Sequence, residues 1–401
     1  MRDPGAGIAG RVVLALVIGQ VGIHASMAGL RMAAPLQTLR EGYGAWSVGM
    51  LLAVFAAAPV LLALWSGRMA DRYGYHRPVH IGIVLTVAGG LLAVASTYAQ
   101  GRLHFGLLMA AGMFAGAGAN MGMLAIQRTA GQAARDAAER VRIFSWLGVA
   151  PSFANVVGPV SAGFMIDYGG FGAAYALMLA LPLLTLVSAR WVPRRPAGPP
   201  AAAPGQHGSA WTLLRAPGMK RLLVVNWLLS ACWDVHSFAV PLIGHEYGYS
   251  ASTICLILGT FTLSVSLIRL VIPMLAHRVS EIVVLRAAMV ATGAVLALYP
   301  FAESPWLMAG LAALLGIGLG AVQPMIMSTL HHLTPPERHG EAIALRSMTI
   351  NSSSALMPLA FGFAGAAFGA ASLFWVMGAL VVAGSVQARR IGAALVDPIR
   401  T

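Results

Sequence analysis

The segment GRMADRYGYHR, residues 67–77, lies between two long apolar runs and guides the interpretation of the whole chain. Its two glycines permit close approach of neighbouring backbone and a tight turn. Its carboxylate, Asp71, stands among arginines and can pair with them or with the N-terminus of a helix. A short basic segment of this kind is typical of a connection between two membrane-spanning helices.

The composition indicates a membrane protein. Hydrophobic residues make up 58% of the 401 residues, charged residues only 10%, and the mean hydropathy is +0.77. Soluble domains carry about 25% charged residues. About twelve runs approach the ~20 apolar residues that a spanning helix needs, and each must be helical because lipid cannot satisfy the backbone. The runs cover residues 12–35, 47–66, 78–98, 105–127, 143–166, 171–190, 222–241, 251–275, 282–300, 306–330, 343–367 and 371–390.

The stretch 191–221 divides these runs into six and six. Its content of Pro, Gly, Ala and Arg predicts a flexible cytoplasmic linker. We therefore expect an N-terminal six-helix bundle over residues 1–190 and a C-terminal six-helix bundle over residues 222–401. The halves echo each other, since Pro35 and Pro241 each close the first run of a half.

The basic residues predict the orientation of the chain. A net charge of +13 could suggest nucleic-acid binding, but no soluble surface remains to carry such a patch. With a cytoplasmic N-terminus, all but four of the 26 Lys and Arg lie in or beside cytoplasmic segments. We therefore expect a multi-pass protein of a bacterial cytoplasmic (inner) membrane, with both termini cytoplasmic. Cys232 and Cys255 both lie in apolar runs, so no disulfide framework is indicated.

The segment at 67–77 resembles the loop between helices 2 and 3 of the major facilitator superfamily, whose pattern is roughly G-x-L-a-D-r-x-G-r-r-r. The number of runs, the two halves and the linker are similar as well. The resemblance implies an all-α integral membrane fold with about twelve transmembrane helices in two six-helix pseudo-repeats. It also implies that the segment is a latch that stabilises the outward-open state. The matching positions are Gly67, Met69, Ala70, Asp71, Arg72, Gly74 and Arg77.

A second stretch, GVAPSFANVVGPVSAG at 148–163, resembles the antiporter motif of the same superfamily. Gly158, Pro159 and Gly163 match that motif, whereas alanines replace two of its glycines. Small residues let helices pack closely and a proline bends a helix, so the match implies a hinge sealed against leak. The alternative is ordinary helix packing.

Charged residues inside apolar runs are the sharpest pointers to function, because each costs ~2.5–3.5 kcal/mol at the helix centre. Asp234 is the only acidic residue well inside a run, and Arg31 lies near the corresponding position of the first half. We expect Arg31 and Asp234 to meet across a central cavity in one conformation. Either Asp234 exchanges protons while Arg31 pairs with it or binds an anionic substrate, or the pair only locks an extracellular gate.

Other polar residues in the runs are candidates with a plain alternative. His24 and His236 lie near the charged residues on the same runs, although a single histidine in a span often only packs. Asn120 is expected either to face the cavity or to form an interhelical hydrogen bond. Arg269 is expected to snorkel or to brace the second basic loop. The serine-rich stretch 351–354 is polar enough to line a cavity.

Together these features predict a secondary transporter that moves a small organic solute by alternating access. A proton-coupled exporter of drugs or metabolites is favoured by the match at 148–163, and a proton-coupled importer of an organic anion is the alternative. A polytopic membrane enzyme is the other class, but the sequence lacks His-Glu-x-x-His, Gly-x-Ser-x-Gly and Gly-x4-Gly-Lys-Ser/Thr segments. We expect no cofactor and no metal. The expected partners are a small-molecule substrate, protons and the lipid bilayer, without nucleic acid, and the protein is expected to be a monomer.

Overall fold

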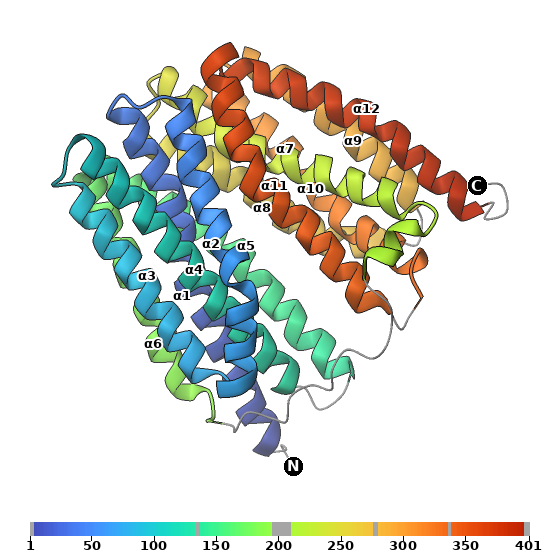
Figure 1. The fold of residues 1–401 in the computed structure, drawn as a ribbon, viewed down its shortest axis with the longest axis horizontal. Helices are drawn as coiled ribbons and strands as arrows, with labels where there is room; N and C mark the ends of the chain where they lie inside the picture. The colour runs from blue at the N-terminus through green and yellow to red at the C-terminus, as the bar shows by residue number, and fades with distance from the viewer. Residues whose placement is uncertain (1–3, 134–136, 195–209, 276–279, 336–337, 397–401) are drawn as a thin grey trace. The chain divides into compact units, whose positions relative to one another are not determined.

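The computed structural model describes residues 4–133, 137–194, 210–275, 280–335 and 338–396, and within these ranges the chain is helical with no strand (Figure 1). The predicted all-α fold with twelve helices is confirmed. The helices are α1 (Pro4–Arg40), α2 (Ala45–Tyr73), α3 (His76–Ser96), α4 (Gly101–Ala133), α5 (Ala137–Ala180), α6 (Pro182–Ser188), α7 (Met219–Glu246), α8 (Ala251–Leu275), α9 (Glu281–Leu298), α10 (Pro305–His332), α11 (His339–Phe368) and α12 (Ala370–Val396).

The helices and the apolar runs differ in places. The backbone of α5 breaks at Gly170, whose φ of 75° is readily adopted only by glycine, so the runs 143–166 and 171–190 lie on either side of this break. Ten stretches of the described residues are long and apolar enough to cross a membrane. The helix α11 is not among them, because its polar residues lower its hydropathy.

Two compact units emerge from the contacts between residues. Unit 1 contains Met1–Tyr43, Val54–Ala203 and the beginning of α8, Ser250–Gly259. Unit 2 contains Gly44–Ala53, Pro204–Tyr249 and Thr260–Thr401. The predicted boundaries at residues 190 and 222 stay a prediction, and residues 195–209 of the expected linker lie outside the described residues.

Small residues bring the helices of each unit close together. In unit 1, α1 packs on α5 and α3 packs on α4, and in unit 2, α12 packs on α7 and α9. A Cβ atom at Gly82 of α3 would lie 2.7 Å from the carbonyl oxygen of Gly118 on α4, so only glycine permits this approach. Backbones in contact gain van der Waals packing, which is the main attraction between helices in lipid.

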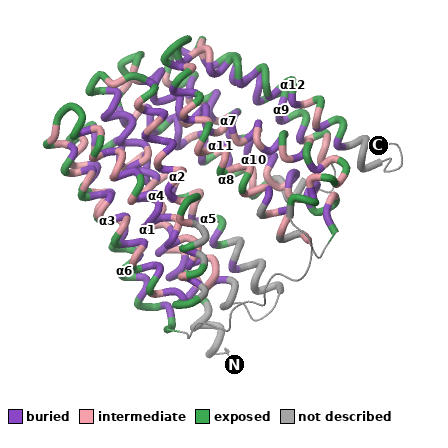
Figure 2. Tube along the Cα trace, viewed as in Figure 1, coloured by how far each residue is buried: buried purple, intermediate pink, exposed green. Residues whose placement is uncertain are grey.

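Exposed residues occur along the helices (Figure 2), and many of them are large apolar residues. Leu61 is 80% exposed and Trp306 is 87% exposed. In water so much apolar surface would cause aggregation, whereas in a bilayer it faces lipid. The exposed apolar faces therefore fit a multi-pass membrane protein.

Candidate functional site

Asp234 is held in the middle of α7 by two serine hydroxyls from α11. The side chain is 4% exposed. Ser353 donates a 2.7 Å hydrogen bond to its Oδ2 atom, and Ser354 donates a 3.3 Å hydrogen bond to its Oδ1 atom. The sequence singled out Asp234 and the serines separately, and the fold of unit 2 brings them together.

A pocket opens beside Asp234 within unit 2. It encloses about 710 Å³ of empty space, its open mouth included. Four helices supply its walls, and apolar and polar residues line it in equal number. They are Asn226, Leu229, Ser230, Trp233 and Asp234 of α7, Arg269 of α8, Leu319, Val322, Gln323 and Ile326 of α10, and Ile350 and Ser354 of α11.

Arg269 lines this pocket, a position that the sequence analysis did not anticipate, and its expected role of snorkelling or bracing the second basic loop stays a prediction. Its Nε atom is buried and has no hydrogen-bond partner among the described residues. Arg346 of α11, which the sequence analysis missed, donates a hydrogen bond to Gln323 at the pocket wall. A signal for Arg346 existed, because it precedes Ser353 by seven residues and so lies on the same face of the helix, two turns away.

His236 lies outside the pocket lining, among aromatic rings of unit 2. Its Nε2 atom lies 2.8 Å from the hydroxyl of Tyr299, and its ring contacts Phe261 at a centroid distance of 4.4 Å. This environment fits the packing alternative for His236 better than a direct role. Its participation in transport stays a prediction.

In unit 1, His24 and Arg31 share one face of α1. The His24 ring hydrogen-bonds the Asn155 side chain of α5, and the charge of Arg31 acts on it. Arg31 and Asp234 belong to different units, so their predicted meeting stays a prediction. Asn120 of α4 donates a long hydrogen bond of 3.5 Å to the carbonyl of Pro59 on α2, which is the interhelical bond given as its alternative.

The segment 67–77 is mostly helical rather than a loop. The helix α2 continues to Tyr73 because Arg, Met and Ala are good helix formers, and α3 begins at His76. Gly74 adopts a φ of 68° at the junction. Arg77 and Arg72 lie over the Tyr73 ring, with the Arg77 guanidinium carbon 4.0 Å from its centroid.

The side chain of Asp71 and the surroundings of Gly67 lie outside the described residues, although both positions belong to α2. The role of the whole segment as a latch therefore stays a prediction.

The glycines of the 148–163 stretch lie at close helix contacts. A Cβ atom at Gly158 would overlap the carbonyl oxygen of Ala25 on α1. One at Gly163 would lie 2.9 Å from the carbonyl oxygen of Ala251, at the start of α8. Pro159 is buried between them. Both glycines are thus required by packing, and whether they also act as a hinge stays a prediction.

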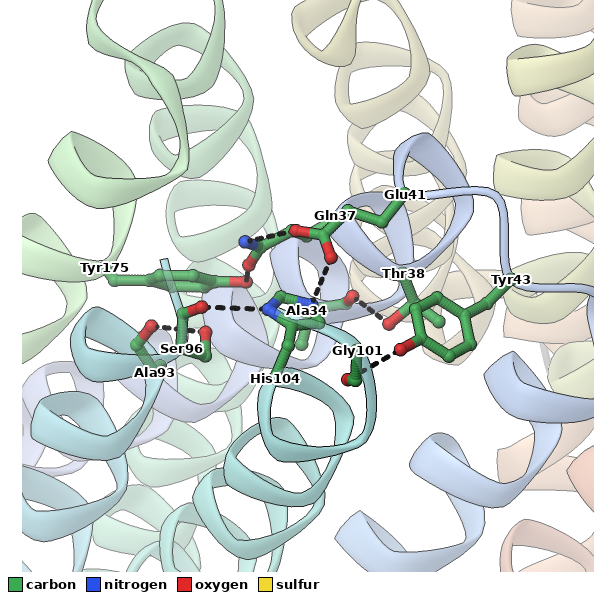
Figure 3. Close-up of polar contacts among 10 residues, drawn as sticks. All are labelled: Ala34, Gln37, Thr38, Glu41, Tyr43, Ala93, Ser96, Gly101, His104 and Tyr175. Atoms are coloured by element: carbon green, nitrogen blue, oxygen red, sulfur yellow. Dashed lines mark hydrogen bonds and ion pairs between the residues drawn. The ribbon is translucent and has the colours of Figure 1, made fainter. Parts of the chain in front are cut away.

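Unit 1 contains a second polar cluster, buried except at Glu41, that the sequence did not reveal and that is here called the Glu41–His104 network (Figure 3). It comprises Gln37, Glu41, Ser96, His104 and Tyr175. The His104 side chain is fully buried, with Nδ1 2.9 Å from the Ser96 carbonyl oxygen and Nε2 3.3 Å from a Glu41 carboxylate oxygen.

Gln37 links Glu41 to Tyr175 in this network, with a 3.3 Å hydrogen bond to the carboxylate and a 2.7 Å hydrogen bond accepted from the phenol. Both ring nitrogens of His104 lie close to oxygen atoms. Apart from the Nε2 atom of His104, which has no hydrogen-bond partner among the described residues, the polar groups of the network bond to one another or to a backbone carbonyl.

The comparisons with known proteins agree with this architecture. The model of the Major Facilitator Superfamily matches residues 16–233 and 222–397. A stretch of 116 residues is 32% identical to the tetracycline resistance protein, class B, of Escherichia coli. That match spans 29% of this chain and 27% of the relative, well under two thirds of its length.

Solved structures share the fold over nearly the whole chain. A POT family transporter in complex with a thioalcohol conjugated peptide has a TM-score of 0.78 at 13% identity, over 96% of both chains. A POT family transporter in complex with 5-aminolevulinic acid has a TM-score of 0.76 at 14% identity, over 94% of this chain and 95% of that one. The nucleoside transporter NupG has a TM-score of 0.71 at 14% identity, over 95% and 99%.

The resemblance first seen in residues 67–77 is therefore confirmed along the chain, and the neighbours are transporters rather than enzymes. The family model covers most of both halves. This chain belongs to the Major Facilitator Superfamily of membrane transporters.

Proposed function

We propose that this transporter is a proton-coupled exporter of a small organic solute that works by alternating access. The observation that carries the proposal is the buried carboxylate of Asp234 at the wall of an open pocket. Burying a carboxylate at this depth is energetically costly, so such residues are usually retained for a function, and proton relay is a frequent one.

The contacts of Asp234 suit a group that gains and loses a proton. A serine hydroxyl can donate a hydrogen bond to a carboxylate and can also accept one from a carboxylic acid. Ser353 and Ser354 can therefore serve both states by rotating their hydroxyl hydrogens. Asp234 carries the proton in this proposal, and the pocket beside it holds the solute.

Export is favoured over import by two features. The relative that is 32% identical over 116 residues is a tetracycline resistance protein. The residues Gly158, Pro159 and Gly163 resemble the antiporter motif. The proposal extends to a bacterial cytoplasmic membrane, a monomer and two cytoplasmic termini. Cysteine labelling of Arg72→Cys and Gly42→Cys from each side of the membrane tests the orientation of the chain.

Proton coupling is tested by the variant Asp234→Asn in everted membrane vesicles. An energised pH gradient is followed with an acridine dye while tetracycline, ethidium and small organic acids are added in turn. A transported solute should dissipate part of the gradient in vesicles with the wild-type chain, and Asp234→Asn should bring this response to background. The matched control is Glu303→Gln, which removes an exposed carboxylate of unit 2. Proton coupling that survives in Asp234→Asn contradicts the proposal.

A proton-coupled importer of an organic anion is the second candidate, because Arg269 places a positive charge at the pocket. The two directions differ in which membrane preparation accumulates the solute. Accumulation by everted vesicles that an uncoupler abolishes supports export. Accumulation only by intact cells supports import.

A further inference from the structure

The polar groups at one end of the unit 2 pocket are incompletely paired. Asn226 lines the pocket and is 1% exposed, yet neither atom of its amide has a hydrogen-bond partner among the described residues. The buried Nε atoms of Arg269 and Arg346 also have none there. Leaving such donors unsatisfied is unfavourable, and a ligand that accepts from them removes the cost.

These groups lie at a common depth. Asn226 precedes Asp234 by eight residues on α7, and Arg346 precedes Ser353 by seven residues on α11. Each separation is about two helical turns, or roughly 10–12 Å along the helix axis. Because Asp234 and Ser353 are hydrogen-bonded, Asn226 and Arg346 lie toward the same end of the pocket.

The charge at this end is positive. Arg269 lines the pocket, and Arg346 is close enough for the two guanidinium groups to repel each other. Asp234 is the only acidic residue in the lining, and its oxygens accept hydrogen bonds from two serines. Two arginines with one carboxylate leave an excess of positive charge that a bound anion neutralises.

We propose that Asn226 and Arg269 bind the carboxylate of a small organic anion, with Arg346 adding a second positive charge from behind Gln323. The body of the anion then lies along the apolar wall toward Trp233 and Asp234. The substrate is thus an organic acid with an apolar or aromatic body. This assignment rests on the proposed transport function and names the substrate class of the same pocket.

The test measures equilibrium binding to the purified full-length protein in lipid nanodiscs. The probes are 3-phenylpropionate, indole-3-acetate and octanoate, each paired with its uncharged primary amide, with inorganic phosphate as a separate arm. Binding is followed by thermal unfolding and by tryptophan fluorescence, since Trp233 lines the pocket. At least one carboxylate should bind, and its amide should bind about tenfold more weakly or worse.

Substitutions locate the carboxylate. Arg269→Gln should weaken carboxylate binding about tenfold or more, Arg346→Gln severalfold, and Arg269→Lys less than Arg269→Gln. The matched control is Arg286→Gln on α9, which removes an exposed arginine and should change nothing. Without ligand, Arg269→Gln should unfold at the wild-type temperature or above it, because one of two repelling charges is gone. This measurement separates lost binding from lost folding.

The assignment would be overturned by amides that bind as well as their acids, by arginine variants that keep wild-type affinity, or by a panel in which no carboxylate binds. Binding of phosphate alone also overturns it. The two proposals can fail separately, because Asp234→Asn tests proton coupling and Arg269→Gln tests carboxylate binding at equilibrium. Arginine-dependent binding together with proton coupling that survives in Asp234→Asn would leave the anion site standing and refute the coupling.

Discussion

The Glu41–His104 network of unit 1 and the pocket of unit 2 bury similar chemistry in opposite ways. In the network, His104 has an oxygen atom beside each ring nitrogen, and Gln37 joins the carboxylate of Glu41 to Tyr175 (Figure 3). In the pocket, the amide of Asn226 and the Nε atom of Arg269 have no hydrogen-bond partner among the described residues. Most side chains of the network contact one another, with only the Nε2 atom of His104 lacking a hydrogen-bond partner among the described residues, whereas the pocket is open to a ligand.

This difference separates structural polar groups from functional ones. Polar groups that satisfy one another stabilise a helix bundle and offer nothing to a solute. Polar groups held without partners reduce stability and are retained where a ligand completes them. Substitutions in the network should therefore reduce stability and leave solute binding unchanged. Substitutions in the pocket should weaken binding or transport and leave stability near that of the wild type.

The largest effect is expected for His104→Ala. It removes a fully buried ring together with its contacts to the carbonyl of Ser96 and the carboxylate of Glu41. The free energy of unfolding should fall by about 2 kcal/mol, since Glu41 is partly exposed and water can compensate it in part. Denaturant unfolding of the purified protein measures this loss.

The matched control for His104→Ala is Arg102→Ala, an exposed position on the same helix that should be neutral. The affinity for a transported solute should be unchanged in both variants. A His104→Ala protein of normal stability with altered solute affinity would reverse the roles given to the two clusters.

A smaller effect is expected in the pocket, where Ser353 and Ser354 hold Asp234. Ser353→Ala should slow proton-driven transport by about five- to tenfold, because it removes the 2.7 Å charge-assisted hydrogen bond. Ser354→Ala removes the 3.3 Å bond and should matter less. Initial rates at saturating solute compare the two variants, and their unfolding temperatures should stay near wild type. Equal rates, or the opposite order, would contradict the assignment of Asp234 as the proton carrier.

The two clusters also differ in how far the sequence could predict them. The length of an apolar run is a local property of the sequence, so the runs predicted twelve helices. Asp234 stood out because it is an acidic residue well inside such a run. The rotation of each helix about its axis is not local, and therefore the sequence did not predict that Arg269 lines the pocket, and it missed Arg346. The Glu41–His104 pair joins residues far apart in the chain through the fold of unit 1, and neither residue stands inside an apolar pattern that would mark it.

The smallest effect is expected at the junction between α2 and α3, where a buried polar group lies outside both clusters. The hydroxyl of Tyr75 is buried without a hydrogen-bond partner among the described residues, but it is uncharged and lies outside the pocket lining. It should only cost stability, so Tyr75→Phe should raise the free energy of unfolding by about 1 kcal/mol or less and leave transport unchanged.

Burial raises the pKa of the Tyr75 phenol above its ordinary value of about 10. The gain should therefore be constant at lower pH and increase above about pH 10, where only the unfolded phenol ionises and wild-type stability falls. Thermal unfolding of both proteins from pH 6 to 11 measures this difference, and a Tyr75→Phe protein that is less stable than wild type would mean that the hydroxyl has a structural partner.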